Sequence, residues 1–337
     1  MPHWLSIFKT FGFLVALSFI AAAWATTQEL KRKEQQGLLH PTVGNVKDKK
    51  GDVVKANIWP HQRLSDITIL AAIGGLAGAK IFNAFETWDD FIQHPIDNLI
   101  SNSGLTFLGG LIVAALVIYF YAKKHQIPYK HLCDAAAPGI MLAYGIGRLG
   151  CQFSGDGDWG IYNTAYVTNA DSTLRAATAA DHSLTMQLIG NTPSAFAPAP
   201  SWLPRWLFGM NYPHNVGHEG IPIHGCIGDY CNVLPVSVFP TPIYEAITCI
   251  ILFFVLWAVR KRFTRSLQMF GTYLILVGVE RFFVELIRVN YKYDLGFVHP
   301  TQAEILSIVL VILGACLLLF YKDKTTVPPD PKSEVIT

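Results

Sequence analysis

Seven long apolar segments constrain the fold of this chain more than any other feature of its sequence. A helix that crosses a lipid bilayer needs about 20 mostly apolar residues, and seven stretches approach that length. We therefore expect an all-α membrane protein with about seven transmembrane helices. The segments are Leu5–Trp24, Ile67–Phe85, Leu105–Tyr121, His131–Phe153, Ile243–Val259, Phe270–Ile287 and Ala303–Tyr321.

The composition supports this interpretation. Of the 337 residues, 51% are hydrophobic and only 15% are charged, whereas a soluble domain carries about 25% charged residues. The deficit indicates that much of the surface faces lipid. The net charge of +2 gives no reason to expect a nucleic-acid partner, and we expect none.

The placement of the basic residues predicts the orientation. Most lysines and arginines fall in alternate flanks, around positions 31–63, 123–130, 260–265 and 322–332. The opposite flanks contain only Arg175, Arg205, Arg288 and Lys292. Because cytoplasmic loops carry the excess of positive charge, the N-terminus is expected outside and the C-terminus in the cytoplasm.

The first segment has an alternative interpretation. The stretch Ala23-Trp24-Ala25 resembles a signal-peptidase site, so residues 1–25 could be a cleaved signal. However, the cluster from Lys31 to Lys33 follows the apolar run instead of preceding it. That order favours a helix that crosses from outside to inside.

We expect one polytopic membrane domain over residues 1–325 and a flexible cytoplasmic tail over 326–337. A polar cytoplasmic loop, about 26–60, is expected to be poorly ordered. A large periplasmic insertion, about 154–242, is expected to combine a short helix within 164–187 with irregular chain over 188–204. It contains Cys226 and Cys231, which form either a disulfide, as an oxidising compartment allows, or a pair of free thiols.

Ionisable residues inside membrane segments are costly, so each is a candidate functional residue. Lys9 lies near a helix end and can reach the interface with its long stem, whereas Lys80 is equally consistent with packing and with function. Arg148 lies in a glycine-rich stretch over 144–160. Glycines allow a ligand to approach the backbone, and the planar guanidinium suits a phosphate. The alternative is an arginine that locks two helices by pairing with a carboxylate.

A second charged group lies on the sixth segment. Arg281 and Glu285 are four residues apart and share one helix face. They form either an internal ion pair or a second phosphate-binding cation oriented by its carboxylate. Glu280 points about a hundred degrees away from Arg281 and is expected to face another partner. Glu245, at the start of the fifth segment, is either a helix N-terminal charge or an acid of the pocket.

Small-residue patches occur in the second and third segments. They are Gly74-Gly75-Leu76-Ala77-Gly78 and Gly109-Gly110. Such patches are more typical of close helix packing in a membrane than of phosphate binding.

Five stretches, taken together and in order, resemble the motifs of the prolipoprotein diacylglyceryl transferase family. The arginine-containing stretch reads Gly147-Arg148-Leu149-Gly150, followed by Gly155-Asp156 and Trp159-Gly160, with one extra residue. The others are Thr106-Phe107-Leu108-Gly109-Gly110-Leu111, Pro240-Thr241-Pro242-Ile243-Tyr244-Glu245, Arg281-Phe282-Phe283-Val284-Glu285 and Ile305-Leu306-Ser307. The resemblance extends from the third segment to the last.

The resemblance implies a reaction in the bacterial inner membrane, with the active site toward the periplasmic side. The diacylglyceryl group of phosphatidylglycerol would pass to the lipobox cysteine of a preprolipoprotein signal peptide, forming a thioether and releasing glycerol phosphate. Membrane lipid is a further partner, and no cofactor or metal is expected. The implied catalytic residues are Arg148, Arg281, Glu285 and Asp156, and the implied substrate-binding residues are Arg148, Gly155, Gly160, Gly109, Gly110, Tyr244 and Glu245.

The sequence also departs from the family pattern. Leu108 occupies the place of a histidine that often precedes Gly-Gly, Phe11 replaces a tyrosine, and Cys151 replaces an asparagine. Without the histidine, Asp156, Glu285 and Glu245 remain as candidate proton acceptors. A non-catalytic lipid-binding paralogue and an anion or lipid transporter remain as alternatives. The odd number of segments and the lack of a matching glycine break in the second half speak against a transporter.

Overall fold

The computed structural model describes residues 10–47, 53–100, 106–290, 292–294, 296 and 299–321. Within these residues the chain forms two compact units. The first comprises described residues of 10–22, 140–262 and 270–321, and the second comprises described residues of 23–139 and 263–269. Two helices, α1 (Thr10–Gln35) and α6 (Tyr129–Ser154), run from one unit into the other. The predicted tail over 326–337 lies outside the described residues.

Each predicted membrane segment overlaps a helix, and residues 5–9 and 105 of these segments lie outside the described residues. Among the described residues, four helical stretches are long and apolar enough to cross a membrane: Thr10–Gln35, Pro60–Glu86, Thr241–Arg262 and Gln302–Phe320. The other three predicted segments correspond to α5 (Phe107–Lys124), α6 and α9 (Gln268–Glu285). The chain is therefore a helical membrane protein, while the count of seven spans stays a prediction.

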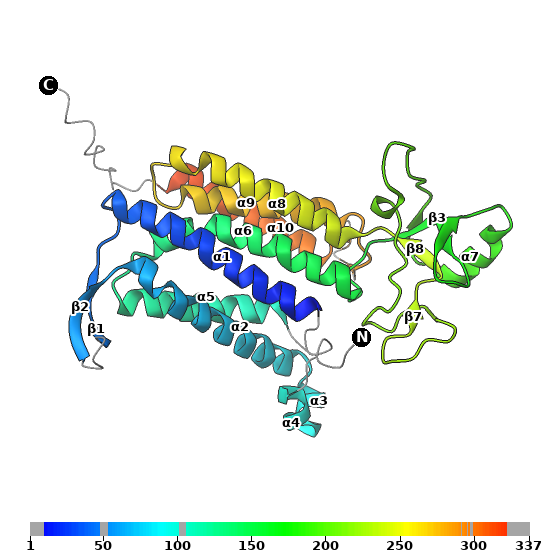
Figure 1. The fold of residues 1–337 in the computed structure, drawn as a ribbon, viewed down its shortest axis with the longest axis horizontal. Helices are drawn as coiled ribbons and strands as arrows, with labels where there is room; N and C mark the ends of the chain where they lie inside the picture. Colours follow the sequence, from blue (N-terminus) through cyan, green and yellow to red (C-terminus); the bar gives the residue numbers. More distant parts are fainter. Residues whose placement is uncertain are drawn as a thin grey trace. The chain divides into compact units, whose positions relative to one another are not determined.

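Glycines lie where helices of the first unit approach one another closely; Figure 1 shows these helices as ribbons. They include α8 (Thr241–Val259), α9 and α10 (Gln302–Phe320). A Cβ atom on Gly145 of α6 would lie 3.1 Å from the Ala246 carbonyl oxygen of α8, and one on Gly278 of α9 would lie 2.8 Å from the Ser307 carbonyl oxygen of α10. Such short approaches allow polar side chains on facing helices to meet.

The large insertion contains a sheet that the all-α prediction did not include. In it, β3 (Tyr162–Thr168) pairs antiparallel with β4 (Leu174–Ala176) and β8 (Val236–Val238), and parallel with β5 (Ser194–Ala195). The helix α7 (Asp181–Ile189) lies beside β3 (Figure 1). It partly overlaps the region where a short helix was predicted. The shorter elements of the insertion are η3 (Arg205–Leu207), β6 (Ile221–Pro222) and β7 (Asn232–Val233).

A buried amide holds the insertion together. Asn163 on β3 has no exposed surface. Its amide nitrogen donates to the carbonyl oxygens of Ala197 and Phe208, each at 2.8 Å, and its amide oxygen accepts from the backbone N–H groups of Ala165 and Ala197. Because buried polar groups are costly unless they are bonded, these four bonds fix irregular chain against the strand.

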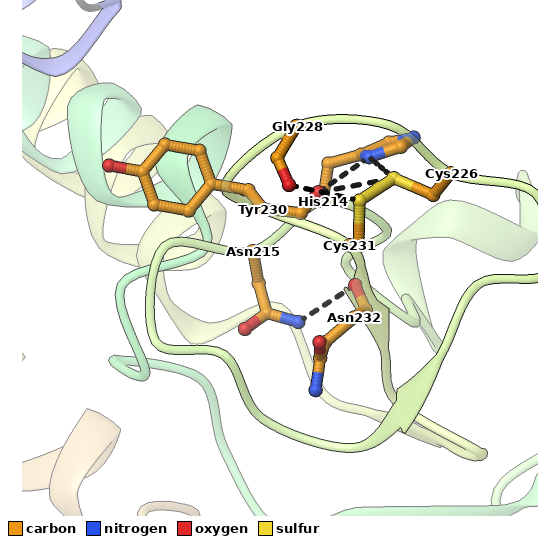
Figure 2. The surroundings of a disulfide bond; sticks show 7 residues. All are labelled: His214, Asn215, Cys226, Gly228, Tyr230, Cys231 and Asn232. Carbon is orange, nitrogen blue, oxygen red and sulfur yellow. Dashed lines mark hydrogen bonds between the residues drawn. A yellow bond between two sulfur atoms is a disulfide. The ribbon is translucent and has the colours of Figure 1, made fainter.

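Cys226 and Cys231 form a disulfide, which confirms the pairing that the sequence left open (Figure 2). Their Cα atoms lie 5.6 Å apart. Near this loop, the side-chain amide of Asn215 donates to the Asn232 carbonyl oxygen at 3.2 Å. The disulfide and this amide bond restrain the part of the insertion that follows η3.

The segment expected to be poorly ordered has defined structure on both sides of residues 48–52. The helix α1 continues to Gln35, and β1 (Thr42–Lys47) pairs antiparallel with β2 (Val53–Ile58). A short η2 turn (Pro60–Arg63) follows. Paired charges stabilise the basic end of α1, because Lys33 lies 3.5 Å from Asp134 and Arg32 lies 2.7 Å from Glu29. The polar composition of this segment did not predict these ion pairs.

The glycine patches of the second unit are helix-packing surfaces, as predicted. The helices α2 (Leu64–Glu86) and α5 pack against each other, and they lie side by side in Figure 1. A Cβ on Gly78 would lie 2.5 Å from the Gly109 carbonyl oxygen, and one on Gly110 would lie 2.8 Å from the Gly75 carbonyl oxygen. Two short helices, α3 (Trp88–Gln93) and α4 (Pro95–Ile100), follow α2.

This packing predicts unequal effects for two similar substitutions on α2. Gly78→Ala should lower the thermal midpoint, because its Cβ would collide with backbone and overpacking costs about 1–3 kcal/mol. Gly75→Ala is the matched control, since its nearest neighbour would be the Gly110 carbonyl oxygen at 3.9 Å. Thermal unfolding of both variants in detergent measures the difference. Equal midpoints for the two variants would contradict the close approach at Gly78.

Candidate active site

The site begins where α6 ends. Arg148 lies in the last two turns of this helix, which stops at Ser154. Gly155 and Gly157 then adopt positive φ angles of 61° and 94°, a conformation that favours glycine. This turn brings Asp158 back toward Arg148, and the two side chains form an ion pair.

Glu245 is the centre of the charged cluster. It lies in the first turns of α8, after Pro240 and Pro242, and it has no exposed surface. Its carboxylate pairs with Arg148, with Arg281 at 3.2 Å and with Arg288 at 3.5 Å. The Tyr144 hydroxyl donates to it at 2.7 Å. One buried carboxylate therefore gathers three arginines from α6, from α9 and from the segment after α9.

Asp158 forms a second bridge between arginines. It pairs with Arg148 and also accepts from Arg288 at 2.5 Å. Its side chain is 35% exposed, which makes it the most accessible acid paired with these arginines. Burial acts to raise the pKa of Asp158, but the charges of Arg288 and Arg148 and their hydrogen bonds outweigh it, so the pKa lies below its usual value.

Glu285 is the third acid that pairs with one of these arginines. It lies 3.0 Å from Arg281, one helical turn earlier on α9, and accepts from the Asn290 side-chain amide at 2.6 Å. The sequence alternative of an Arg281–Glu285 ion pair is thus present in the structure. Arg281 nevertheless also reaches Glu245, so it is shared between two carboxylates.

Gly160 allows the segments that carry Asp158 and Arg288 to approach each other. Its N–H donates to the Phe239 carbonyl oxygen at 2.8 Å, and it forms a backbone bridge with Arg288. A Cβ on Gly160 would lie 2.7 Å from the Ile287 carbonyl oxygen. Gly155 is similarly confined, since its Cβ would lie 2.9 Å from Asn215. Both glycines shape the backbone around the arginines.

The structure brings together most of the predicted site. Arg148, Arg281, Glu245 and Glu285 form one connected network, and Gly155 and Gly160 frame it. The Tyr244 hydroxyl instead donates to the Leu207 carbonyl oxygen in the insertion. Gly109 and Gly110 belong to the second unit and pack against α2. Their role in substrate binding stays a prediction.

Asp156 differs from the prediction in its contacts. Its carboxylate accepts from the Asp158 backbone N–H at 3.3 Å, and it pairs with no arginine among the described residues. Asp158 and Arg288 were not selected from the sequence. The spacing that resembles the family motif selected Asp156, and the sequence analysis assigned Arg288 to a loop. Arg288 lies beyond the end of α9, and its backbone bridge to Gly160, which no sequence pattern showed, brings it to the cluster.

One group of side chains has the spacing of metal ligands. Single ligand atoms of Cys151, Asp156 and Asp158 all lie within 4.8 Å of one another. Asp158 already has its charge matched by two arginines. The donor set is therefore better explained by an ion-pair network than by a cation site.

These features define a class of protein: a helical membrane protein with a partly buried cluster of arginines held by ion pairs to carboxylates. The family model for prolipoprotein diacylglyceryl transferase matches residues 5–320. The chain belongs to this family.

Curated relatives cover most of the chain. A phosphatidylglycerol–prolipoprotein diacylglyceryl transferase of Leptospira interrogans is 26% identical over 93% of this chain and 89% of its own length. Proteins with the same name from Xylella fastidiosa and Staphylococcus haemolyticus are 26% and 25% identical, over 80% and 78% of this chain and 81% and 74% of their own lengths.

The Asp158 bridge predicts a pH-dependent contribution to stability. Because its pKa is lower in the folded state, the stabilisation is fully present above the unfolded value, about 3.9, and is lost as pH falls through the folded value. Asp158→Asn should lower the thermal midpoint at pH 7, and the gap to the wild type should narrow below about pH 4. Asp156→Asn is the matched control and should stay near wild type. A gap that is constant with pH would contradict the ion-pair assignment.

Proposed function

We propose that this protein transfers the diacylglyceryl group of phosphatidylglycerol to the lipobox cysteine of a preprolipoprotein. The thiol sulfur forms a thioether with the glyceryl carbon, and glycerol phosphate leaves. The observation that carries the proposal is the convergence of Arg148, Arg281 and Arg288 on Glu245. Membership of the family and the names of the curated relatives support the same reaction.

The arginines would bind the phosphate of the lipid headgroup. Arg148 and Arg288 are already arranged around one anionic group, the carboxylate of Asp158. A phosphate presents oxygens to two guanidinium groups in a similar way. The Nε atom of Arg288 is buried and has no hydrogen-bond partner within the described residues. It is the donor of Arg288 that neither Glu245 nor Asp158 pairs within the described residues.

The same arginines would act on the reaction rate. As the bond between the glyceryl carbon and the phosphate oxygen breaks, negative charge grows on the phosphate. Fixed guanidinium groups in a water-poor site stabilise that charge more in the transition state than in the bound lipid. Ion pairs with Glu245 and Glu285 hold Arg281 in place before the lipid arrives.

We place the site at the periplasmic side of the inner membrane, in a protein of seven spans with the N-terminus outside. Arg148 lies near the end of α6, Arg281 lies near the end of α9, Arg288 follows α9, and Glu245 lies at the start of α8. The end of α6 and the start of α8 flank the insertion that contains the Cys226–Cys231 disulfide. A disulfide is typical of an oxidising compartment, which supports the outward orientation derived from the basic residues.

The acceptor would be the signal peptide of a preprolipoprotein. Its lipobox cysteine lies close to an apolar segment, so the peptide can enter the site from the surrounding lipid. The thiol attacks well only as a thiolate, and a group in the site must take its proton. Asp156, Glu285 and Glu245 were the candidates from sequence, and Glu245 and Glu285 are engaged by arginines here.

Arg148→Ala tests the proposed chemistry. Full-length protein is incubated with phosphatidylglycerol and a lipobox peptide, and mass spectrometry measures the diacylglyceryl adduct per folded molecule. Loss of the arginine should lower turnover by roughly a hundred- to a thousand-fold. Arg148→Lys should rescue poorly, because a point charge lacks the planar fork.

The matched control is Arg175→Ala in the insertion. Arg175 pairs with Asp181 and is 41% exposed, so this variant should retain turnover. Near-normal turnover in folded Arg148→Ala would refute a phosphate-binding role and leave only helix locking. A wild-type protein that adds no mass to the lipobox peptide, or that adds the same mass to its Cys→Ser form, would refute transfer to the cysteine.

A further inference from the structure

Glu280 differs from the other acids near the arginines. It lies on α9 directly before Arg281 and is 5% exposed. Both of its carboxyl oxygens are buried, and neither has a hydrogen-bond partner among the residues that the structure describes. The sequence analysis expected Glu280 to face a partner other than Arg281. In the part of the chain described, that partner is not a side chain or a backbone group.

Glu280 nevertheless belongs to the charged cluster. Glu280 is adjacent in the chain to Arg281, and its carboxyl group interacts electrostatically with Glu245, Arg281 and Arg148. Among the described residues, the titratable and charged groups that interact with it come from three helices, α6, α8 and α9. They are Tyr144, Arg148, Glu245, Cys249, Tyr273 and Arg281.

The charge balance of the cluster determines whether the Glu280 side chain is ionised or neutral. In the described residues, the three guanidinium groups of Arg148, Arg281 and Arg288 are matched by three carboxylates that contact them. An ionised Glu280 would add a buried negative charge beside Glu245, without a donor. Burying an unpaired carboxylate is costly, and such a group is neutralised instead. The site therefore accommodates Glu280 as the neutral acid.

The reaction requires one group that can hold a proton. Arginine does not release its proton in proteins, and Asp158, Glu245 and Glu285 are already engaged in ion pairs with the arginines. Among the described residues, Asp156 and Glu280 are the acids near these arginines that pair with none of them, and of the two only Glu280 is buried, since Asp156 is exposed. Glu280 therefore holds a proton and lies beside the arginines that would bind the phosphate.

We propose, on the basis of the transferase function above, that Glu280 is the acid–base group of the site. Its carboxyl proton passes to the phosphate oxygen as the glyceryl carbon–oxygen bond breaks, and that oxygen keeps the bonding electron pair. The acceptor thiol supplies the new carbon–sulfur bond and gives its proton to the Glu280 carboxylate. One proton moves from sulfur to phosphate, and Glu280 ends as it began, as the neutral acid.

Three proteins compared in the peptide assay test this role: wild type, Glu280→Gln and Glu280→Asp. Glu280→Gln should lower kcat about a hundred-fold or more, leave the KM for phosphatidylglycerol unchanged and flatten the pH dependence of kcat. Glu280→Asp keeps a titratable group and should be more active than Glu280→Gln. A packing role predicts the reverse order, because glutamine preserves the shape of glutamate and aspartate does not.

The control is Glu304→Gln on α10. Glu304 closes the capping box of that helix, a role that glutamine also fills, so kcat and its pH profile should match wild type. Wild-type kcat and pH profile in Glu280→Gln, with an active wild-type protein, would overturn the proposal and leave the transferase function intact. An inactive wild-type protein would instead overturn the proposed function, on which the acid–base role depends.

Infrared spectroscopy of the resting wild-type protein tests the neutral acid without turnover, and it applies if Glu280→Gln does not fold. A protonated carboxyl band should be present near neutral pH and should change position in Glu280→Asp. The absence of such a band would overturn the proposal.

Discussion

The buried carboxylate of Glu245 is the interaction on which the rest of the site depends. Three arginines from three parts of the chain contact it, and none of them could be brought into a lipid-surrounded bundle without a compensating charge. Glu245 is fully buried, so these pairs are weakly screened and fix the relative positions of α6, α8 and α9. The Tyr144 hydroxyl adds a fourth donor and limits the rotation of the carboxylate.

Glycines make this arrangement sterically possible. Gly145 allows α6 to approach α8, and Gly160 allows the chain after α6 to meet the backbone that carries Arg288. A side chain at either position would separate the groups that the ion pairs join. Glycines have the same role in the second unit, where Gly78 and Gly110 allow α2 and α5 to approach each other. Close helix packing and charge pairing thus depend on each other.

The sequence predicts the helical membrane segments well because long apolar runs have few other outcomes in a bilayer. It also predicts that Arg148 and Arg281 matter, since intramembrane charges are costly. It does not predict the sheet around β3, because strands of two to seven residues leave little periodic signal. Nor does it select Asp158 over Asp156, because a turn with two positive-φ glycines decides which carboxylate points at Arg148.

The energetics of buried ion pairs bear on why this cluster exists. A buried pair gains Coulomb energy but loses the hydration of both ions, and a well-packed apolar replacement is often as stable or more stable. Locking helices together therefore does not require three arginines and several acids within one small volume. Moreover, one paired acid, Asp158, remains 35% exposed and lies on a glycine-rich turn instead of a helix. The proposed phosphate binding accounts for this exposure, because an incoming phosphate would replace the Asp158 carboxylate while Glu245 continues to hold the arginines.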